Sequence, residues 1–205
     1  AEFPVEGKSV KSTLFSVSDC QAITKKAIVE SLKTRYHEDW FPETGPTFRI
    51  EVALRKDIVT LTLDSSGSGL HRRGYKQLVG EAPLRETMAA GLILLSRWNP
   101  DTTLIDPFCG SGTIPIEAAL LGRNIAPGLF RHFDCERWPW ISDNTVRTVR
   151  EEAQDKADWD RPLEIMGTDA DDAAVKTARR NAEKASMDEG IHFQTQPLEA
   201  LRSSR

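Results

Sequence analysis

The alternation of apolar and polar residues along the chain predicts two structural units, the first of mixed α+β type. Apolar residues recur at helical spacing between Asp19 and Tyr36, which predicts an amphipathic helix with Ser18 or Asp19 as its N-cap. Alternation over residues 47–54 predicts a strand, and residues 58–63 predict its hairpin partner. Together these elements predict a small α+β module.

The second unit alternates helices with strands, and a Ser- and Gly-rich stretch at residues 65–69 separates it from the first. Strands and helices in this order predict an α/β domain with a Rossmann-like, doubly wound parallel sheet. The expected helices cover residues 83–98, 113–121 and 171–185, and the expected strands cover residues 102–105, 164–168 and 191–193. The expected domains are a first module at 1–65, a linker at 66–82 and the Rossmann-like domain at 83–205.

Composition places the chain among ordinary globular proteins, with 39% hydrophobic and 28% charged residues in 205. Its longest unbroken apolar run, Leu92–Leu95, is far shorter than the roughly 20 residues that cross a bilayer, so we expect no membrane span and a cytoplasmic location. The three cysteines, Cys20, Cys109 and Cys135, are odd in number and far apart, which predicts reduced thiols. The four histidines show no metal-ligand spacing, so we predict no metal.

The net charge of −4 is unevenly distributed along the chain. Residues 1–100 hold 14 Lys and Arg against 12 Asp and Glu, whereas residues 101–205 hold 13 against 19. A polyanionic partner would therefore meet local patches, chiefly in the first half. Plain scatter of charges is the alternative, with residues 72–76 as a solvated linker. The candidate contacts to RNA are Lys8, Lys11, Arg72, Arg73 and Lys76.

The stretch richest in chemical information follows the first expected strand of the second unit and reads Asp106-Pro107-Phe108-Cys109-Gly110-Ser111-Gly112-Thr113. In open α/β sheets the ligand lies beyond the carboxyl ends of the strands, and glycines let the backbone approach it. A nucleoside triphosphate loop would end in Gly-Lys-Ser/Thr, which is absent, and a dinucleotide loop would have a third glycine where Pro115 stands. Asp106 instead favours a cationic ligand such as S-adenosylmethionine.

A second acidic pair follows the next expected strand, where Asp169 and Asp171 stand. A carboxylate there can accept hydrogen bonds from both ribose hydroxyls of a nucleoside. Either residue could instead simply cap the following helix. Combined with the glycine loop, the pair predicts a nucleoside site with S-adenosylmethionine as the cofactor.

Further motifs accompany these two: Arg73-Gly74-Tyr75, Ala82-Pro83-Leu84-Arg85-Glu86 and Gly167-Thr168-Asp169. With them, residues 70–197 resemble the methyltransferase domain of the THUMP-domain RNA methyltransferases, a bacterial group that methylates the exocyclic N2 of guanine in large-subunit ribosomal RNA. Residues 1–65 resemble the later part of a THUMP module through Val5-Glu6-Gly7-Lys8-Ser9 and the helix that begins Asp19-Cys20-Gln21.

The resemblance implies a methyltransferase that uses S-adenosylmethionine and methylates the N2 of a guanine in 23S rRNA, with ribosomal RNA as its partner. It places Asp106 at the methionine end of the cofactor and Asp169 at the ribose. The full set of expected cofactor-binding residues is Leu84, Asp106, Phe108, Gly110, Ser111, Gly112, Thr113, Asp169, Ala170 and Gln196.

The chain also departs from that family's pattern. The family's sheet continues to an Asn-Pro-Pro-aromatic loop after the fourth strand, and this chain stops at Arg205 before such a motif. It also starts at Ala1 without Met. We therefore expect the middle part of a longer protein, assign no catalytic residue, and expect these residues alone to bind the cofactor weakly or not at all and to show no turnover.

Two other functions stay open at this point: an amino-methyltransferase acting on adenine or cytosine in DNA, which shares the glycine loop, and a non-catalytic RNA-binding or cofactor-binding fragment. The aromatic stretch at residues 132–140 could stack on a base, although packing is the plainer interpretation. Cys109 could suggest a nucleophile, but without a neighbouring base it is expected to be a small buried side chain.

Overall fold

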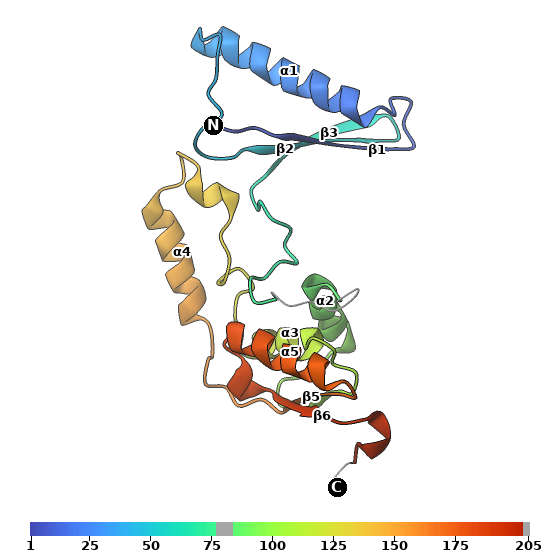
Figure 1. The fold of residues 1–205 in the computed structure, drawn as a ribbon. Coiled ribbons are helices and arrows are strands. Elements are labelled where there is room, and N and C mark those ends of the chain that lie inside the picture. Colours follow the sequence, from blue (N-terminus) through green and yellow to red (C-terminus); the bar gives the residue numbers. More distant parts are fainter. Residues whose placement is uncertain (77–83, 203–205) are drawn as a thin grey trace. The chain divides into compact units, whose positions relative to one another are not determined.

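The computed structural model describes residues 1–76 and 84–202 and divides the chain into two compact units (Figure 1). Unit 1 is not continuous in sequence, because a segment from the second half of the chain belongs to it. Unit 1 comprises Ala1–Ser68 and Phe133–Val146, and unit 2 comprises Gly69–His132 and Arg147–Arg205. The expected boundaries at 1–65, 66–82 and 83–205 remain a prediction.

Unit 1 is a three-stranded sheet with one helix on its face. Its elements are β1 (Val5–Val10), α1 (Val17–Tyr36), β2 (Arg49–Arg55) and β3 (Ile58–Asp64). The strand order is β1-β2-β3, with β1 parallel to β2 and β2 antiparallel to β3. The hairpin prediction is confirmed, and its turn is made by Lys56 and Asp57, which both have positive φ as a tight primed turn requires. The strand β1 was not predicted.

The helix α1 differs from the prediction in its cap and in its buried side. The N-cap is Ser16, whose side chain accepts a hydrogen bond from the backbone N–H of Asp19, so the predicted cap at Ser18 or Asp19 was wrong. Ile23 lies on the predicted apolar stripe but is 69% exposed. The helix instead meets β1 through Gln21, which donates a hydrogen bond to the carbonyl of Val5 at 2.9 Å.

The segment that joins unit 1 from the second half of the chain carries the aromatic stretch, beginning with a short 3-10 helix, η1 (Asp134–Arg137). Trp138 is 7% exposed, and its indole N–H donates to the carbonyl of Thr47 at 2.9 Å. Phe48 stacks on both Trp138 and Trp140, with ring centroids 5.4 Å apart in each pair. Packing is therefore the role that the structure gives Trp138, as the plainer interpretation held.

Unit 2 holds the parallel sheet, with strand order β4-β5-β6. The helix that follows β4 and the helix that follows β5 both pack on β5 and on each other, so they cover one face of the sheet, as in one half of a doubly wound sheet. The α/β prediction is confirmed. The elements of the second half of the chain are α2 (Glu86–Ser96), β4 (Leu104–Asp106), α3 (Thr113–Gly122), α4 (Asp143–Asp155), β5 (Ile165–Asp169), α5 (Asp172–Lys184), η2 (Asp188–Gly190), β6 (His192–Thr195) and η3 (Leu198–Ala200).

The core of unit 2 lies between the sheet and the helices α3 and α5. The helix α3 is apolar nearly all round, and Ile116 and Ala118 are completely buried. Across from them lie Val175 and Ala178 on α5 and Phe193 on β6. Because α3 is buried on most of its surface, its first turn is anchored in the core directly after the loop. The polar helix α4 was missed, and the predicted helix start at Pro83 lies outside the described residues.

Candidate functional site

The candidate site lies where β4 and β5 end side by side. Because these strands are parallel and Asp106 pairs with Gly167, their carboxyl ends fall at the same edge of the sheet. The glycine loop leaves β4 there, and Asp169 is the last residue of β5. The glycine loop and Asp169 therefore lie at one edge of the sheet, as the predicted nucleoside site requires.

Backbone N–H groups of the loop are held by acceptors from both strands. The N–H of Phe108 donates to Asp106 Oδ1 at 3.1 Å. The N–H of Cys109 donates to the carbonyl of Thr168 at 2.9 Å, and that of Gly110 donates to Asp169 Oδ2 at 2.9 Å. The Asp169 carboxylate therefore ties the loop to the end of β5, in addition to any contact it makes with a ligand.

The far end of the loop is held from two other elements. Asn181, a buried residue of α5, donates from its side-chain amide to the carbonyl of Ser111 at 3.0 Å. Lys76 donates from Nζ to Thr113 Oγ1 at 2.9 Å, and Thr113 is the first residue of α3. Sequence reasoning missed Asn181 altogether, because nothing near it in the chain marks a partner 70 residues away.

The two glycines of the loop differ in what surrounds them. Both have positive φ, +51° at Gly110 and +80° at Gly112, a region that favours glycine. A Cβ on Gly110 would meet nothing within 4 Å, whereas one on Gly112 would lie 2.9 Å from the Cβ of Ala178. The backbone is therefore open to a ligand at Gly110, while Gly112 makes room for the close approach of α5. The expectation that both glycines give clearance to the ligand fits Gly110 only.

Two carboxylates give the site its electrostatic character. Burial raises the pKa of Asp106 above its ordinary value, the N–H of Phe108 opposes this, and the negative charge of Asp169 adds to it. A cation placed beside them would relieve this cost. Burial, with the charges of Asp106 and Asp169, also raises the pKa of Cys109 to about 12, so its thiol is protonated and is no nucleophile.

Asp171 and the predicted cofactor residues Gln196, Phe108, Ala170 and Leu84 remain to be placed. Asp171 accepts from the N–H of Ala173 at 2.9 Å and is the N-cap of α5, as the alternative interpretation held. Gln196 is tied to β5, because its N–H donates to the carbonyl of Asp169, while its side-chain amide donates to the carbonyl of Ala200 at 2.7 Å. Phe108, Ala170 and Leu84 are exposed.

The predicted RNA-contacting residues are divided between the two units. Lys8 and Lys11 belong to unit 1, where Lys8 pairs with Glu51 of the neighbouring strand. Arg72, Arg73 and Lys76 belong to unit 2. Of these three, Arg72 is exposed, whereas Arg73 and Lys76 turn inward toward α3.

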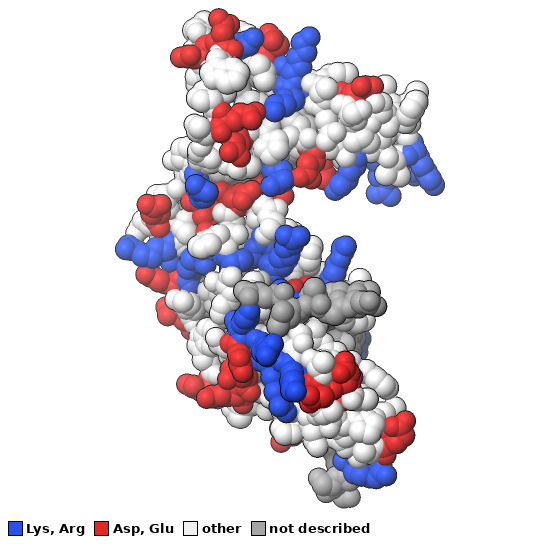
Figure 2. All heavy atoms as spheres, viewed as in Figure 1, with Lys and Arg blue, Asp and Glu red and all other residues white. Residues whose placement is uncertain are grey.

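Surface charge and metal chemistry add little to the site. On the face shown in Figure 2, basic and acidic side chains are interspersed over both units. Among the residues that the structure describes, no group of His, Cys, Asp and Glu could hold a metal ion. Within the same residues, no helix combines the length and apolarity needed to cross a membrane.

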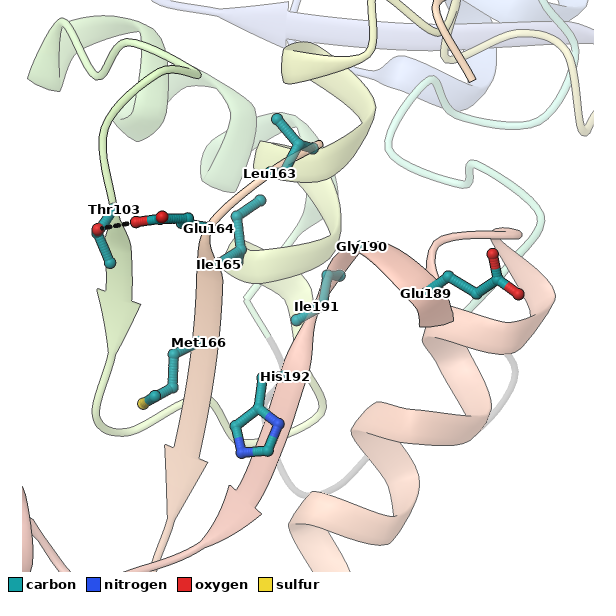
Figure 3. A pocket seen from close by; sticks show the side chains of 9 residues that line it. All are labelled: Thr103, Leu163, Glu164, Ile165, Met166, Glu189, Gly190, Ile191 and His192. Atoms are coloured by element: carbon teal, nitrogen blue, oxygen red, sulfur yellow. Dashed lines mark hydrogen bonds between the residues drawn. The ribbon is translucent and has the colours of Figure 1, made fainter. Parts of the chain in front are cut away.

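One hollow of unit 2 lies away from this chemistry. It has a volume of about 440 Å³ and sits at the beginnings of the three strands, where Thr103, Glu164 and Ile191 precede β4, β5 and β6 (Figure 3). Thr103 Oγ1 and Glu164 Oε2 lie 2.6 Å apart there and share a hydrogen bond. Parallel α/β sheets bind ligands at the opposite, carboxyl ends of the strands, so we assign the site to the glycine loop.

Solved structures of methyltransferases share this fold. One, from Listeria monocytogenes, is described as a "predicted N6-adenine-specific DNA methylase", with 50% identity and a TM-score of 0.95 over 100% of this chain and 54% of that one. Another, SMU.472, is described as "a putative methyltransferase complexed with SAH", with 44% identity and a TM-score of 0.93 over 100% of this chain and 55% of that one. TrmN from Thermus thermophilus, 21% identical, shares the fold with a TM-score of 0.59 over 95% of this chain and 46% of that one.

Sequence relatives point the same way. A Bacillus subtilis protein named "Putative RNA methyltransferase YpsC" is 53% identical over 194 residues, which are 94% of this chain and 50% of that protein. The chain thus spans about half the length of the relatives it matches. Residues 1–64 match the THUMP domain, and residues 73–205 match the family described as "RMKL-like, methyltransferase domain". The chain belongs to this RMKL-like methyltransferase family and carries a THUMP domain ahead of the methyltransferase domain.

Proposed function

We propose that this protein is an S-adenosylmethionine-dependent RNA methyltransferase whose cofactor site is the edge formed by the glycine loop and Asp169. The observation that carries the proposal is the pair of carboxylates, Asp106 and Asp169, beside the open backbone of Gly110. A phosphate chain would be repelled by these two charges, whereas the ammonium and sulfonium groups of the methyl donor would be attracted.

The residues present fit the cofactor. Asp106 is partly buried, and burial raises its pKa by disfavouring the ionised carboxylate. A neighbouring cation would stabilise that ionised form. Asp169 accepts a hydrogen bond on each carboxylate oxygen, from the N–H groups of Gly110 and Asp171. Each oxygen has a further lone-pair direction for a ribose hydroxyl. The SMU.472 structure, described as complexed with SAH, supports the same cofactor.

The cofactor supplies an electrophilic methyl group when it is bound. The chain's own contribution at this edge is to hold that group in a fixed direction, because the loop is tied to β5, α5 and Lys76. Fixed placement of two reactants removes a large entropic part of the barrier to a displacement reaction. We assign no catalytic residue to this chain.

The proposed substrate is the exocyclic N2 of a guanine in 23S rRNA. The THUMP domain at residues 1–64 and the name of the Bacillus relative support RNA as the partner. The guanine and its place in ribosomal RNA rest on the family resemblance of the motifs at residues 73–75, 82–86 and 167–169.

Mass spectrometry of ribosomal RNA nucleosides tests this proposal. Cells that lack the gene are expected to lose one N2-methylguanosine from 23S rRNA, and expression of the complete gene product is expected to restore it. An unchanged set of methylated guanosines would contradict the guanine assignment. Purified complete gene product that fails to methylate any RNA from the deletion strain would contradict RNA as the substrate.

A second candidate function is amino-methylation of adenine in DNA, which the description of the Listeria protein as an N6-adenine-specific DNA methylase favours. The same purified protein distinguishes the two when it is offered deletion-strain RNA and unmethylated genomic DNA in parallel with a labelled methyl donor. Label in DNA alone would support the second function.

A further inference from the structure

The basic run at residues 72–76, expected to contact RNA, divides in the structure into an exposed part and an inward-facing part. Arg73 is 12% exposed, and its guanidinium lies 3.4 Å from the carboxylate of Glu117, which is 2% exposed. Tyr75 is buried and donates from its hydroxyl to Glu117 Oε1 at 2.9 Å. Two of the residues before Lys76 are therefore anchored on one carboxylate of α3.

Glu117 stands one helical turn after Thr113, so this anchor brings the next residue to the first turn of α3. Lys76 makes two contacts there. Its Nζ donates to Thr113 Oγ1 at 2.9 Å and to the backbone carbonyl of Leu84, just ahead of α2, at 2.6 Å. A single ammonium group thus bridges the segment that enters α2 and the helix that leaves the glycine loop.

The bridge reaches the loop itself through one more contact. Thr113 directly follows Gly112, and its hydroxyl lies 3.4 Å from that of Ser111. Burial lowers the pKa of Lys76, against the attraction of Glu86 and Glu117. Two of the three N–H donors of this partly buried ammonium bind protein acceptors. Breaking either bond would leave a partly buried polar group unpaired, which costs more free energy than an exposed hydrogen bond contributes.

We propose that Lys76 is a positioning residue of the methyl-donor site, which acts through Thr113 to fix the carboxyl end of the glycine loop relative to α2. This rests on the proposed function, because it takes the glycine loop as the cofactor site. Arg73 and Tyr75 hold Lys76 in place through Glu117. Of the basic run, Arg72 alone keeps an exposed side chain for a phosphate contact.

The test compares Lys76→Met with Arg85→Met in the complete gene product. Arg85 is an exposed cation next to Leu84 whose side chain makes no capping hydrogen bond, so its removal changes charge without breaking the bridge. Calorimetry with S-adenosylhomocysteine is expected to show at least about tenfold weaker binding for Lys76→Met, the scale of losing hydrogen bonds from a charged donor, and a change below about twofold for Arg85→Met.

Three further measurements separate positioning from a general loss of stability. Lys76→Arg keeps donors for both acceptors and is expected to recover most of the affinity. In a double-mutant cycle, Lys76→Met is expected to add little once Thr113→Val has removed the acceptor hydroxyl, whereas independent structural damage would add fully. Under steady-state conditions, Lys76→Met is expected to raise KM for the methyl donor and to leave KM for RNA unchanged.

The outcomes distinguish this inference from the proposed function. If wild-type protein binds S-adenosylhomocysteine and Lys76→Met binds it equally well, the inference is overturned and the proposed function stands. If wild-type protein does not bind it, the proposed function itself is overturned. Should Lys76→Met fail to fold, Lys76→Gln decides, because its shorter side chain cannot reach both Thr113 and Leu84: weaker binding supports the bridge, and unchanged binding overturns it.

Discussion

The backbone N–H of Gly110 donates to the Asp169 carboxylate at 2.9 Å, and this bond joins the loop after β4 to the end of β5. A second N–H, that of Asp171, donates to the other oxygen of the same carboxylate at 3.0 Å. Asp169 is therefore part of the scaffold of the site as well as a proposed ligand for the ribose. Its replacement is expected to affect binding through both roles.

We expect Asp169→Ala to weaken binding of S-adenosylhomocysteine by more than about 1 kcal/mol, because hydrogen bonds to a charged group are lost and the loop is released. Calorimetry on the complete gene product measures this. Asp171→Asn is the matched control, since asparagine also caps a helix well and the α5 N-terminus stays satisfied. Equal affinities for wild type and Asp169→Ala would show that neither role of Asp169 contributes to binding.

Asp106→Asn is expected to stabilise the protein at pH 7 while weakening cofactor binding. The pKa of Asp106 is raised in the folded state, so folding costs free energy whenever the carboxylate is ionised in both states. This cost is present at neutral pH. It disappears as the pH falls below 3.8, the ordinary pKa of an aspartate, because Asp106 is then protonated in both the folded and the unfolded state.

Urea unfolding of wild type and Asp106→Asn at pH 7 and at lower pH checks this dependence. The difference in the free energy of unfolding between Asp106→Asn and wild type should become smaller as the pH is lowered. The exposed Asp188→Asn serves as the control and should show no such difference. A variant less stable than wild type at pH 7 would mean that Asp106 makes a stabilising contact that outweighs its burial.

Gly112→Ala is expected to destabilise unit 2 by roughly 1–3 kcal/mol, because the new methyl would lie 2.9 Å from Ala178 in a backbone conformation that disfavours side chains. Gly110→Ala has the same kind of backbone conformation but open space around it, so only the conformational cost of roughly 1–2 kcal/mol applies. Chemical denaturation of the two variants gives the comparison. Equal losses would indicate that α5 yields easily at Ala178.

Trp138→Phe is expected to destabilise unit 1 by about 1–2 kcal/mol, since it removes the hydrogen bond to Thr47 and leaves that carbonyl without its indole partner. Trp140→Phe is the control, because Trp140 is 66% exposed and keeps an aromatic ring against Phe48. Hydrogen exchange of the β2 amides reports the local effect. The assignment of the aromatic segment to unit 1 would be wrong if β2 protection were unchanged in Trp138→Phe.

Local patterns predicted much of the fold and the centre of the site. The β2–β3 hairpin followed from alternation around Lys56 and Asp57, and the positions of Asp106 and Asp169 at strand ends followed from the order of strands and helices. Each of these features is marked by a pattern of neighbouring residues: the hairpin by its alternation and turn, and each acidic residue by the strand it follows. For α1 the predicted buried side was wrong. Ile23 fits the helical spacing of apolar residues but is exposed, because α1 has no fully buried residue.

Contacts between residues far apart in the chain could not be predicted from the sequence. Asn181 holds Ser111, and Lys76 holds Thr113, through bonds that no local pattern marks. Gly112 was expected to clear space for a ligand, although its space is taken by Ala178. For the same reason, Lys76 was grouped with Arg72 by sequence proximity, whereas the structure separates an exposed cation from an anchored one.

Because Trp138 and its neighbours pack into unit 1, the THUMP-bearing unit is encoded in two pieces of the gene with methyltransferase sequence between them. A cut after residue 68 would leave Thr47 and Phe48 facing water. Anyone grafting this module onto another enzyme would have to transplant residues 133–146 with it, and evolutionary exchange of the two modules faces the same coupling.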